Sequence, residues 1–280
     1  SPNVQVILDK FKFRNQIDTM VDADILGAVI EKFTSSDINL SPNPIYKDAE
    51  KTILKHPGLD NHGMGTIFEE LIRKFNEENN EEAGEHWTPR DVVELMADLV
   101  FLPIADKIQD ASYSCYDGAC GTGGMLTVAQ ERLLELAHQS GKEVSIHLFG
   151  QEINPETYAI CTADMLLKGD GEEAEHIKYC STLSADQNAS RQFDFMLSNP
   201  PYGKSWKTDA EKMGGKKEIL DTRFNTYLEG GEMMPMIPRT SDGQLLFLLN
   251  NVAKMKKDTP LGSRIAEVHN GASIFTGDAG

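Results

Sequence analysis

Cysteine is scarce in this sequence, and its arrangement excludes two common kinds of site. The chain has 280 residues and only 4 cysteines. None of them forms a Cys-x-x-Cys pair, so neither a zinc finger nor a disulfide framework is expected, and buried, reduced thiols are the simplest interpretation. The 7 histidines are scattered and never form His-Glu-x-x-His, so we expect no metal site.

Long hydrophobic runs are also absent. No apolar run approaches the roughly 20 residues that a membrane span needs, and the first residues show no signal-peptide pattern. We therefore expect a cytoplasmic protein without a membrane segment. The chain begins without methionine and stops just after a strand-like segment, which indicates a piece of a longer protein.

Positive charge is in short supply. The chain has 27 Lys and Arg residues against 44 Asp and Glu residues, a formal net charge of -17. Affinity for DNA comes largely from Lys and Arg side chains that neutralise phosphates, so this surface should repel DNA over most of its area. Either the substrate is not a nucleic acid, or another subunit holds the DNA.

The hydrophobic pattern divides the chain at about residue 83. Before that point, apolar residues recur at helical spacing, and a polar run follows at residues 76–82. We therefore predict an N-terminal helical domain over residues 1–83 and a second domain over residues 84–280. The helical spacing is clearest in Ile25, Val29, Ile30, Phe33, Ile67, Phe68, Leu71, Ile72 and Phe75.

The second domain alternates short apolar runs with amphipathic helices. This alternation predicts the α/β class, a mostly parallel sheet with helices on both faces. The predicted strands are residues 113–116, 144–149, 177–180, 193–197 and 263–269, and the predicted helices are residues 91–100, 124–138, 155–167 and 244–256.

A glycine-rich turn, Asp117-Gly-Ala-Cys-Gly-Thr-Gly-Gly124, follows the first predicted strand. Ligands bind at the carboxyl ends of strands in open α/β sheets, and glycines let a ligand approach the main chain closely. The spacing is not Gly-x-Gly-x-x-Gly and no P-loop lysine follows, so a dinucleotide or a nucleotide phosphate fits poorly. An acidic residue at the start of the turn suits an ammonium group, which favours the methionine end of S-adenosylmethionine.

The second predicted strand leads into Glu152. A carboxylate at this tip can accept hydrogen bonds from both hydroxyls of a ribose, as the acidic residue of nucleotide-binding α/β folds does. An exposed strand-end charge is the simpler alternative, and the preceding glycine-rich turn favours the ribose role.

The strand-like run at residues 193–198 leads directly into Asn199-Pro-Pro-Tyr202. An adenine amine is a poor nucleophile because its lone pair is delocalised into the ring. If the Asn199 side-chain oxygen and the Pro200 carbonyl accept its two N–H bonds, the lone pair is fixed toward a methyl donor. Pro200 and Pro201 stiffen the loop, and Tyr202 offers a face to a base flipped out of the duplex. A simple turn is the alternative for this motif taken alone.

Together these motifs resemble the modification (methyltransferase) subunit of bacterial type I restriction-modification systems. The resemblance runs from about Asp60 to the end and includes the segment Gly84-Glu-His-Trp-Thr-Pro-Arg90. It implies a class I S-adenosylmethionine-dependent methyltransferase, with a Rossmann-like fold, that methylates N6 of adenine in duplex DNA in the bacterial cytoplasm. By position, it implies that the cofactor is bound by Glu85, His86, Trp87, Thr88, Pro89, Arg90, Asp117, Ala119, Gly121, Thr122, Gly123, Gly124 and Glu152.

Two positions add detail to this resemblance. From the residues alone, the segment before Asp91 predicts only a helix start, with Thr88 as the N-cap and Pro89 at the first helical position. Ser181 stands where members of the family often have Asp or Asn, which leaves the contact to the cofactor's adenine unassigned.

The resemblance also implies partners that account for the acidic charge. In that family a separate DNA specificity subunit recognises the DNA, two methyltransferase subunits clamp around it, and an endonuclease and translocase subunit is expected as well. The segment at residues 203–241 follows the catalytic loop, and we expect it to be either a phosphate contact or a disordered polar loop. The basic residues on which this expectation rests are Lys204, Lys207, Lys212, Lys216, Lys217 and Arg223.

Two other functions stay open. Protein-glutamine and guanine-N2 RNA methyltransferases also use Asn-Pro-Pro-Tyr, although they are usually smaller and lack the segment at residues 84–90. A DNA-binding scaffold with dead chemistry is a different class, and the intact set Asn199, Tyr202, Asp117 and Glu152 argues against it.

Overall fold

The computed structural model describes residues 13–59, 88–168 and 171–271, with the single positions Ile67, Glu70 and Lys74. Most of the predicted helix around residues 64–75, the polar run 76–82, the predicted domain boundary and the predicted cofactor residues Glu85, His86 and Trp87 lie outside the described residues. Within the described part, no helix has the length and apolar character to cross a membrane.

The described N-terminal part holds two helices and a short strand pair. Helices α2 (Phe13–Asp22) and α3 (Leu26–Phe33) agree with the helical spacing in the sequence. Strands β1 (Ile45–Tyr46) and β2 (Leu54–His56) instead pair antiparallel inside the stretch predicted as helical. The Asp48 carboxylate closes this hairpin by accepting the backbone N–H groups of Thr52 at 2.9 Å and Ile53 at 2.7 Å. The sequence pattern places only helix-breaking residues at 41–44 and 56–58 here and does not predict the hairpin itself.

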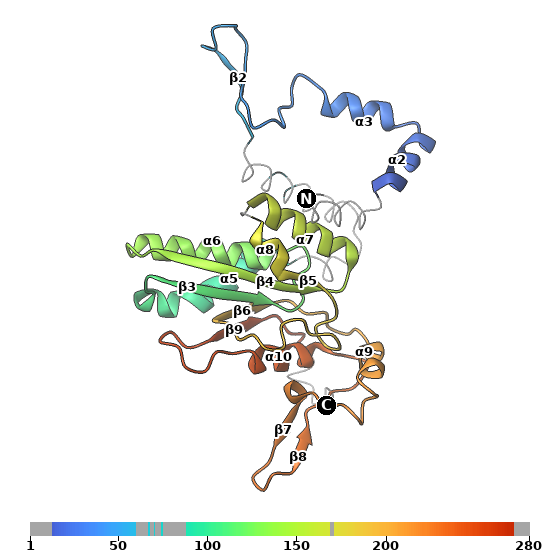
Figure 1. The fold of residues 1–280 in the computed structure, drawn as a ribbon, viewed down its shortest axis with the longest axis vertical. Coiled ribbons are helices and arrows are strands. Elements are labelled where there is room, and N and C mark those ends of the chain that lie inside the picture. The colour runs from blue at the N-terminus through green and yellow to red at the C-terminus, as the bar shows by residue number, and fades with distance from the viewer. Residues whose placement is uncertain are drawn as a thin grey trace.

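A five-stranded sheet forms the centre of the described C-terminal part (Figure 1). Every neighbouring pair of its strands is parallel, as predicted. The first strand, β3, has the next two strands on one side and the last two on the other, so the sheet has a switch point between β3 and β6. In spatial order the strands are β5 (Ile177–Tyr179), β4 (Val144–Glu152), β3 (Ala111–Asp117), β6 (Phe195–Ser198) and β9 (Arg264–Glu267).

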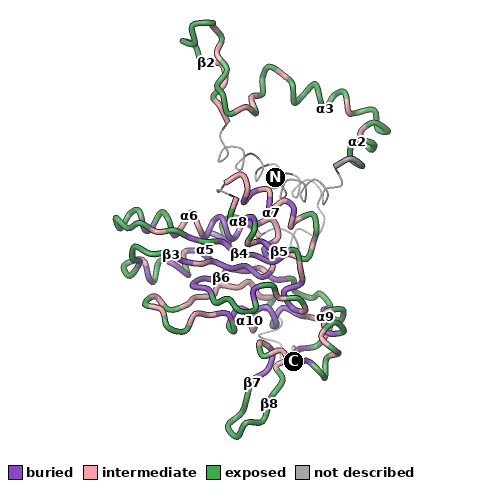
Figure 2. The backbone as a smooth tube through the Cα atoms, viewed as in Figure 1, coloured by how far each residue is buried: buried purple, intermediate pink, exposed green. Residues whose placement is uncertain are grey.

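Apolar side chains are buried on both faces of this sheet, and Figure 2 colours much of its strands as buried. Successive strand residues point to opposite faces, so Leu148 belongs to the large core cluster while its neighbour Phe149 belongs to a smaller one. The large cluster is completed by α5 (Arg90–Phe101), η1 (Leu102–Lys107), α6 (Gly124–Gln139), α7 (Pro155–Lys168) and α8 (Glu172–His176).

Helix α5 begins one residue later than the predicted cap at Thr88 implies. Pro89 is the N-cap, with an extended backbone at ψ 135°, and Arg90 is the first helical residue. Thr88 is therefore not the N-cap: its hydroxyl accepts a hydrogen bond from the Asn199 side chain at 3.0 Å. A contact from a distant loop has replaced the local capping bond.

The segment at residues 203–241 is folded rather than disordered. It contains α9 (Lys207–Lys212), η2 (Thr222–Phe224) and the antiparallel pair β7 (Asn225–Tyr227) and β8 (Met233–Pro235), which projects from the body in Figure 1. Its apolar residues pack with α10 (Gln244–Ala253) in a separate cluster of Leu183, Trp206, Ala210, Ile219, Phe224, Leu246 and Phe247.

Arg223 in this segment has a structural role and is not available to phosphates. Its guanidinium donates to the backbone carbonyls of Thr182 at 2.8 Å and Leu183 at 2.9 Å. It also forms an ion pair with Asp221 at 2.7 Å, and its side chain is only 11% exposed. The expectation of a phosphate contact is therefore wrong for Arg223, because the guanidinium holds the loop after β5 in place.

Candidate active site

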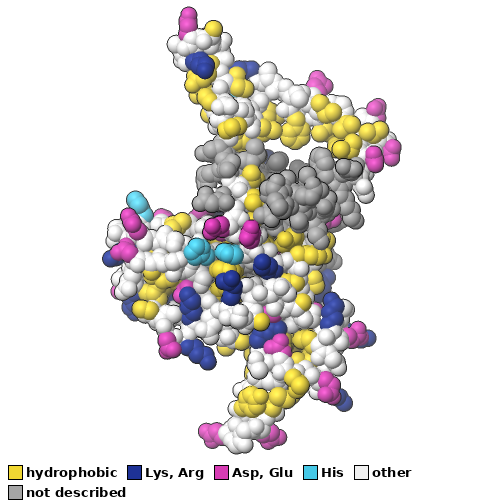
Figure 3. Space-filling model, in the orientation of Figure 1, with side chains coloured by type: hydrophobic (Ala, Val, Ile, Leu, Met, Phe, Trp, Pro, Cys, Tyr) yellow, Lys and Arg dark blue, Asp and Glu magenta, His cyan; other side chains and the backbone are white. Residues whose placement is uncertain are grey.

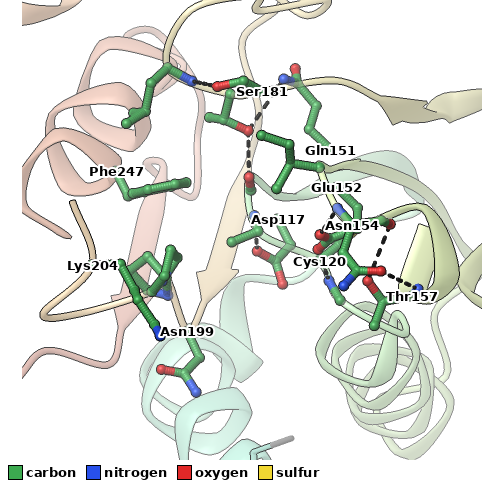
Figure 4. Close-up of a pocket in the computed structure, with 18 of the residues that line it drawn as sticks. Asp117, Cys120, Gln151, Glu152, Asn154, Thr157, Ser181, Asn199, Lys204 and Phe247 are labelled. Carbon is green, nitrogen blue, oxygen red and sulfur yellow. Dashed lines mark hydrogen bonds between the residues drawn. The ribbon is translucent and has the colours of Figure 1, made fainter. Parts of the chain in front are cut away.

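A cavity of about 420 Å³ lies at the carboxyl ends of β3, β4, β5 and β6, over the switch point of the sheet. The structure brings most of the predicted site residues together on its walls (Figure 4). These are Thr88, Asp117, Ala119, Gly121, Thr122, Gly124, Glu152, Asn199, Pro200, Pro201 and Tyr202.

The glycine-rich turn is tied to the end of β4. Gly121 has a φ of 53°, in the left-handed region that glycine adopts without strain. Its backbone N–H donates to the Glu152 carboxylate at 2.8 Å, and the N–H of Cys120 donates to the Gln151 carbonyl at 3.1 Å. The turn is therefore fixed in place before a ligand binds.

Gly123 belongs to the packing of the fold rather than to the cavity wall. It has a φ of 90° and is the N-cap of α6. A Cβ at this position would lie 2.8 Å from Cys161 Sγ and 3.1 Å from Met165 Cε, both on α7. Gly123 was predicted to contact the cofactor, but it packs against helix α7 instead.

Asp117 is a buried carboxylate at the end of β3. It is 2% exposed, and its Oδ1 accepts the Ala119 N–H at 2.9 Å and the Ser198 hydroxyl at 2.7 Å. Burial raises the pKa of Asp117 to about 7; these two hydrogen bonds oppose the rise, and the nearby Glu152 and Glu267 carboxylates add to it. A cation bound beside Asp117 would favour its ionised form.

Glu152 ends β4 and lines the cavity. Oε1 accepts the Asn154 N–H at 2.7 Å and Oε2 accepts the Gly121 N–H at 2.8 Å. Each carboxylate oxygen has a further lone pair, so the group can still accept two hydroxyls of a diol.

Asn199 presents an acceptor that no described residue uses. Its Nδ2 donates to the Thr88 hydroxyl at 3.0 Å, while its Oδ1 is buried and has no hydrogen-bond partner among the described residues. Buried polar atoms are nearly always paired in folded proteins. An N–H group of a ligand would supply the missing partner.

Pro89 and Arg90 do not reach the cavity, although both were predicted to bind the cofactor. Neither lines the cavity, and both are exposed at the start of α5. Arg90 forms ion pairs with Glu94 at 3.1 Å and Glu131 at 3.3 Å, so its contacts tie α5 to α6.

The structure adds residues that sequence reasoning missed. Phe247 on α10 and Trp206 before α9 line the cavity, with exposed fractions of 9% and 3%. Figure 4 shows Phe247 and Lys204 on the same side of the cavity as Asn199. In the sequence, Phe247 looked like one more apolar residue of a buried helix, so no local signal marked it.

These features define a class of protein. A parallel sheet in this order, with a glycine-rich turn after its first strand and Asn-Pro-Pro-Tyr after its fourth, is that of a class I S-adenosylmethionine-dependent methyltransferase. A Listeria monocytogenes protein assigned to that class has a similar fold, with a TM-score of 0.54 and 15% identity over 79% of this chain and 57% of that one. The predicted fold class is confirmed.

The chain belongs to the N-6 DNA Methylase family, which matches residues 59–279. It is similar to the type I restriction enzyme MpnII methylase subunit of Mycoplasma pneumoniae, with 30% identity over 67% of this chain and 32% of that protein. The type I restriction-modification system methyltransferase subunit from Streptococcus thermophilus matches with a TM-score of 0.50 and 29% identity, over 70% of this chain and 37% of that one. The chain thus spans about a third of the length of these relatives.

Proposed function

We propose that this chain is the catalytic part of a DNA methyltransferase that uses S-adenosylmethionine to methylate N6 of adenine. The observation that carries the proposal is the buried, unpaired Asn199 Oδ1 on the wall of a cavity that also holds Asp117 and Glu152. Membership of the N-6 DNA Methylase family supports it.

The residues at the ends of β3 and β4 fit S-adenosylmethionine. Asp117 suits the ammonium group, because a neighbouring cation stabilises a buried carboxylate whose pKa is raised. Glu152 suits the ribose diol, and Gly121 leaves open space above the turn, since a Cβ there would meet nothing within 4 Å. When bound, S-adenosylmethionine supplies a methyl group on a positively charged sulfur.

Asn199 and Pro200 orient the amine that receives the methyl group. The Asn199 Oδ1 and the Pro200 carbonyl accept the two N–H bonds, which draws the nitrogen toward tetrahedral geometry and fixes its lone pair. Positioning of this kind supplies much of the rate of a transfer reaction. The Thr88 hydroxyl holds the Asn199 amide in this role through its hydrogen bond to Nδ2.

Two aromatic side chains can hold the flipped base. Tyr202 is 36% exposed at the cavity and Phe247 lies in its wall. A base taken out of the duplex loses its stacking energy, and stacking on aromatic rings returns about 1–3 kcal/mol per base. Tyr202 and Phe247 therefore favour a planar substrate over a flexible one.

Recognition of DNA is delegated to a partner in this proposal. The net charge is -17, and Figure 3 shows basic and acidic side chains interspersed on the visible face. A DNA specificity subunit bound to two copies of the methyltransferase, joined by an endonuclease and translocase subunit, would supply phosphate contacts that a strongly acidic chain makes poorly.

Transfer of a tritiated methyl group tests the proposed function. The chain is assayed on unmethylated duplex DNA, hemimethylated duplex DNA and a glutamine-containing peptide, with and without its co-purified partner. Label at N6 of adenine is expected with the partner present. Label on the peptide alone would assign the site to protein methylation, and no label with any substrate would contradict catalysis.

A further inference from the structure

We propose that Asp209, on helix α9, receives the exocyclic amine of the cofactor's adenine ring and so selects the base of the cofactor. The inference rests on the proposed use of S-adenosylmethionine and deepens it. It concerns a residue that lies 57 positions after Glu152 in the chain, within the segment at residues 203–241.

The order of the strands fixes the direction in which the cofactor extends. Asp117 ends β3, Glu152 ends the neighbouring β4, and β5 comes next. Parallel strands lie about 4.8 Å apart. A ligand with its ammonium group at Asp117 and its ribose at Glu152 therefore extends its base toward the end of β5. The residues after β5 that line this end of the cavity are Cys180, Ser181, Thr182 and Leu183.

A carboxylate from a different segment lies at this end of the cavity. Asp209 lines the cavity and is half-buried. Its Oδ1 accepts the hydroxyls of Ser181 at 2.6 Å and Ser184 at 2.5 Å. No residue that the structure describes hydrogen-bonds or ion-pairs with its Oδ2. A carboxylate held on one oxygen and open on the other is a preformed acceptor for an N–H donor.

The Ser181 hydroxyl already forms hydrogen bonds with its own loop and with Asp209. Its hydroxyl donates to Asp209, and its oxygen accepts the backbone N–H groups of Leu183 at 3.2 Å and Ser184 at 3.3 Å. The short Ser181 side chain, in the loop after β5, thus anchors the longer Asp209 side chain at the cavity. The acceptor comes from α9, and the loop after β5 supplies its anchor.

The chemistry of a carboxylate decides which purine fits. A purine with an amine at position 6 donates an N–H to Asp209 Oδ2. A purine with a carbonyl at position 6 would instead place an oxygen against this carboxylate oxygen. A site built to accept an N–H group strongly rejects an analogue without one. Since α9 follows the catalytic loop, the same contact would tie the base of the cofactor to the segment at residues 203–241.

Paired calorimetric titrations test this role. S-adenosylhomocysteine and its deaminated analogue, S-inosylhomocysteine, are titrated into the wild-type chain and into Asp209→Asn. The wild type should bind the adenine compound at least about 100-fold more tightly than the inosine compound. In Asp209→Asn, Oδ1 still accepts the two serines while Nδ2 can donate to a carbonyl, so the ratio should fall at least ten-fold. Both ligands are measured on one preparation, so partial unfolding of a variant does not change the ratio.

Glu211→Gln is the matched control. Glu211 lies on the same helix, its side chain is 65% exposed, and its ion pair is with Lys207 at 3.9 Å; it does not line the cavity. This variant should keep the wild-type ratio. An unchanged ratio in Asp209→Asn would overturn the role of Asp209 while leaving the proposed cofactor intact. Failure of the wild type to bind S-adenosylhomocysteine would instead overturn the proposed cofactor itself.

Discussion

The Asn199 side chain is oriented by a hydrogen bond from its Nδ2 to the Thr88 hydroxyl. That bond fixes the amide plane and leaves Oδ1 buried and unpaired among the described residues. An unsatisfied buried acceptor costs about 1–3 kcal/mol in a folded protein. In the proposed function, an amine bound at Oδ1 removes this cost.

Asn199→Ala should lower the rate of methyl transfer about 10²–10³-fold, the loss expected for one well-placed hydrogen bond in a transition state. Affinity for S-adenosylhomocysteine should hardly change. Thr88→Val keeps the two acceptors, Asn199 Oδ1 and the Pro200 carbonyl, and removes only the hydrogen bond that orients the Asn199 amide. The rate of methyl transfer should therefore fall by less in this variant. Single-turnover assays on DNA with the partner present measure both. A near wild-type rate for Asn199→Ala would remove this residue from the mechanism.

Asp117 should make cofactor binding depend on pH. Its pKa is raised to about 7, so the free protein holds this proton below that pH, and the proton must leave when an ammonium group binds. Affinity for S-adenosylhomocysteine should therefore rise about ten-fold between roughly pH 6 and pH 8 and then level off. Asp117→Asn should bind more weakly and lose this rise. Calorimetry across the range decides, and a flat wild-type profile would contradict the role of Asp117.

In the cofactor-free protein, the raised pKa of Asp117 also decides whether stability rises or falls with pH. The pKa of Asp117 in the folded protein, about 7, lies above its ordinary value of 3.8. As the pH rises, the unfolded chain therefore releases this proton at a lower pH than the folded protein does. The contribution of Asp117 to stability is therefore most favourable below about pH 4 and falls by up to about 1.4 kcal/mol per unit as the pH rises toward 7. Asp117→Asn should flatten this part of the urea-unfolding profile.

At the scale of elements, the junction of β3 with α6 serves two purposes at once. The turn must leave room for a ligand on one side and let α6 lie close to α7 on the other. Gly121 faces open space, while a Cβ on Gly123 would lie 2.8 Å from Cys161 Sγ on α7. The glycines of one motif are therefore required for different physical reasons.

Gly123→Ala should destabilise the fold even without cofactor. A residue with a Cβ at a φ of 90° is strained by about 1–3 kcal/mol, and the contact with α7 adds to this. Gly124→Ala is the matched control, because a Cβ there meets nothing within 4 Å. Denaturant unfolding of the cofactor-free protein compares the two. Equal stability of both variants would show that Gly123 is not a packing position.

For the whole molecule, the proposed site for amine methylation contrasts with a surface charge that is unsuitable for DNA. A formal charge of -17 repels a polyanion such as DNA. In addition, the basic residue Arg223 donates its hydrogen bonds to the loop after β5 and is not available to phosphates. Chemistry and recognition are therefore expected to reside in different chains.

The isolated chain should bind duplex DNA weakly and without sequence preference, because few phosphates can be neutralised at its surface. Addition of a specificity subunit should create tight, sequence-selective binding, while S-adenosylhomocysteine should bind the chain alone. Gel-shift titrations with and without the second protein, at physiological salt, make the comparison. Tight, selective binding by the chain alone would contradict delegated recognition.

The sequence by itself determined the parallel α/β fold, the positions of the glycine-rich turn and Asn-Pro-Pro-Tyr, and hence the class of chemistry. Hydrophobic period and turn residues are local properties, so β3, β4 and β6 fell close to their predicted bounds. The hairpin of β1 and β2 escaped prediction, since its closure depends on one Asp48 carboxylate.

Only the tertiary structure decided which distant side chains meet. Thr88 and Asn199 are 111 residues apart and share a hydrogen bond, Phe247 comes from α10 to the cavity wall, and Asp209 rests on two serines that follow β5. No periodicity in the chain encodes such pairs. They arise because the burial of apolar faces brings separate elements to one edge of the sheet, where their polar side chains share a cavity.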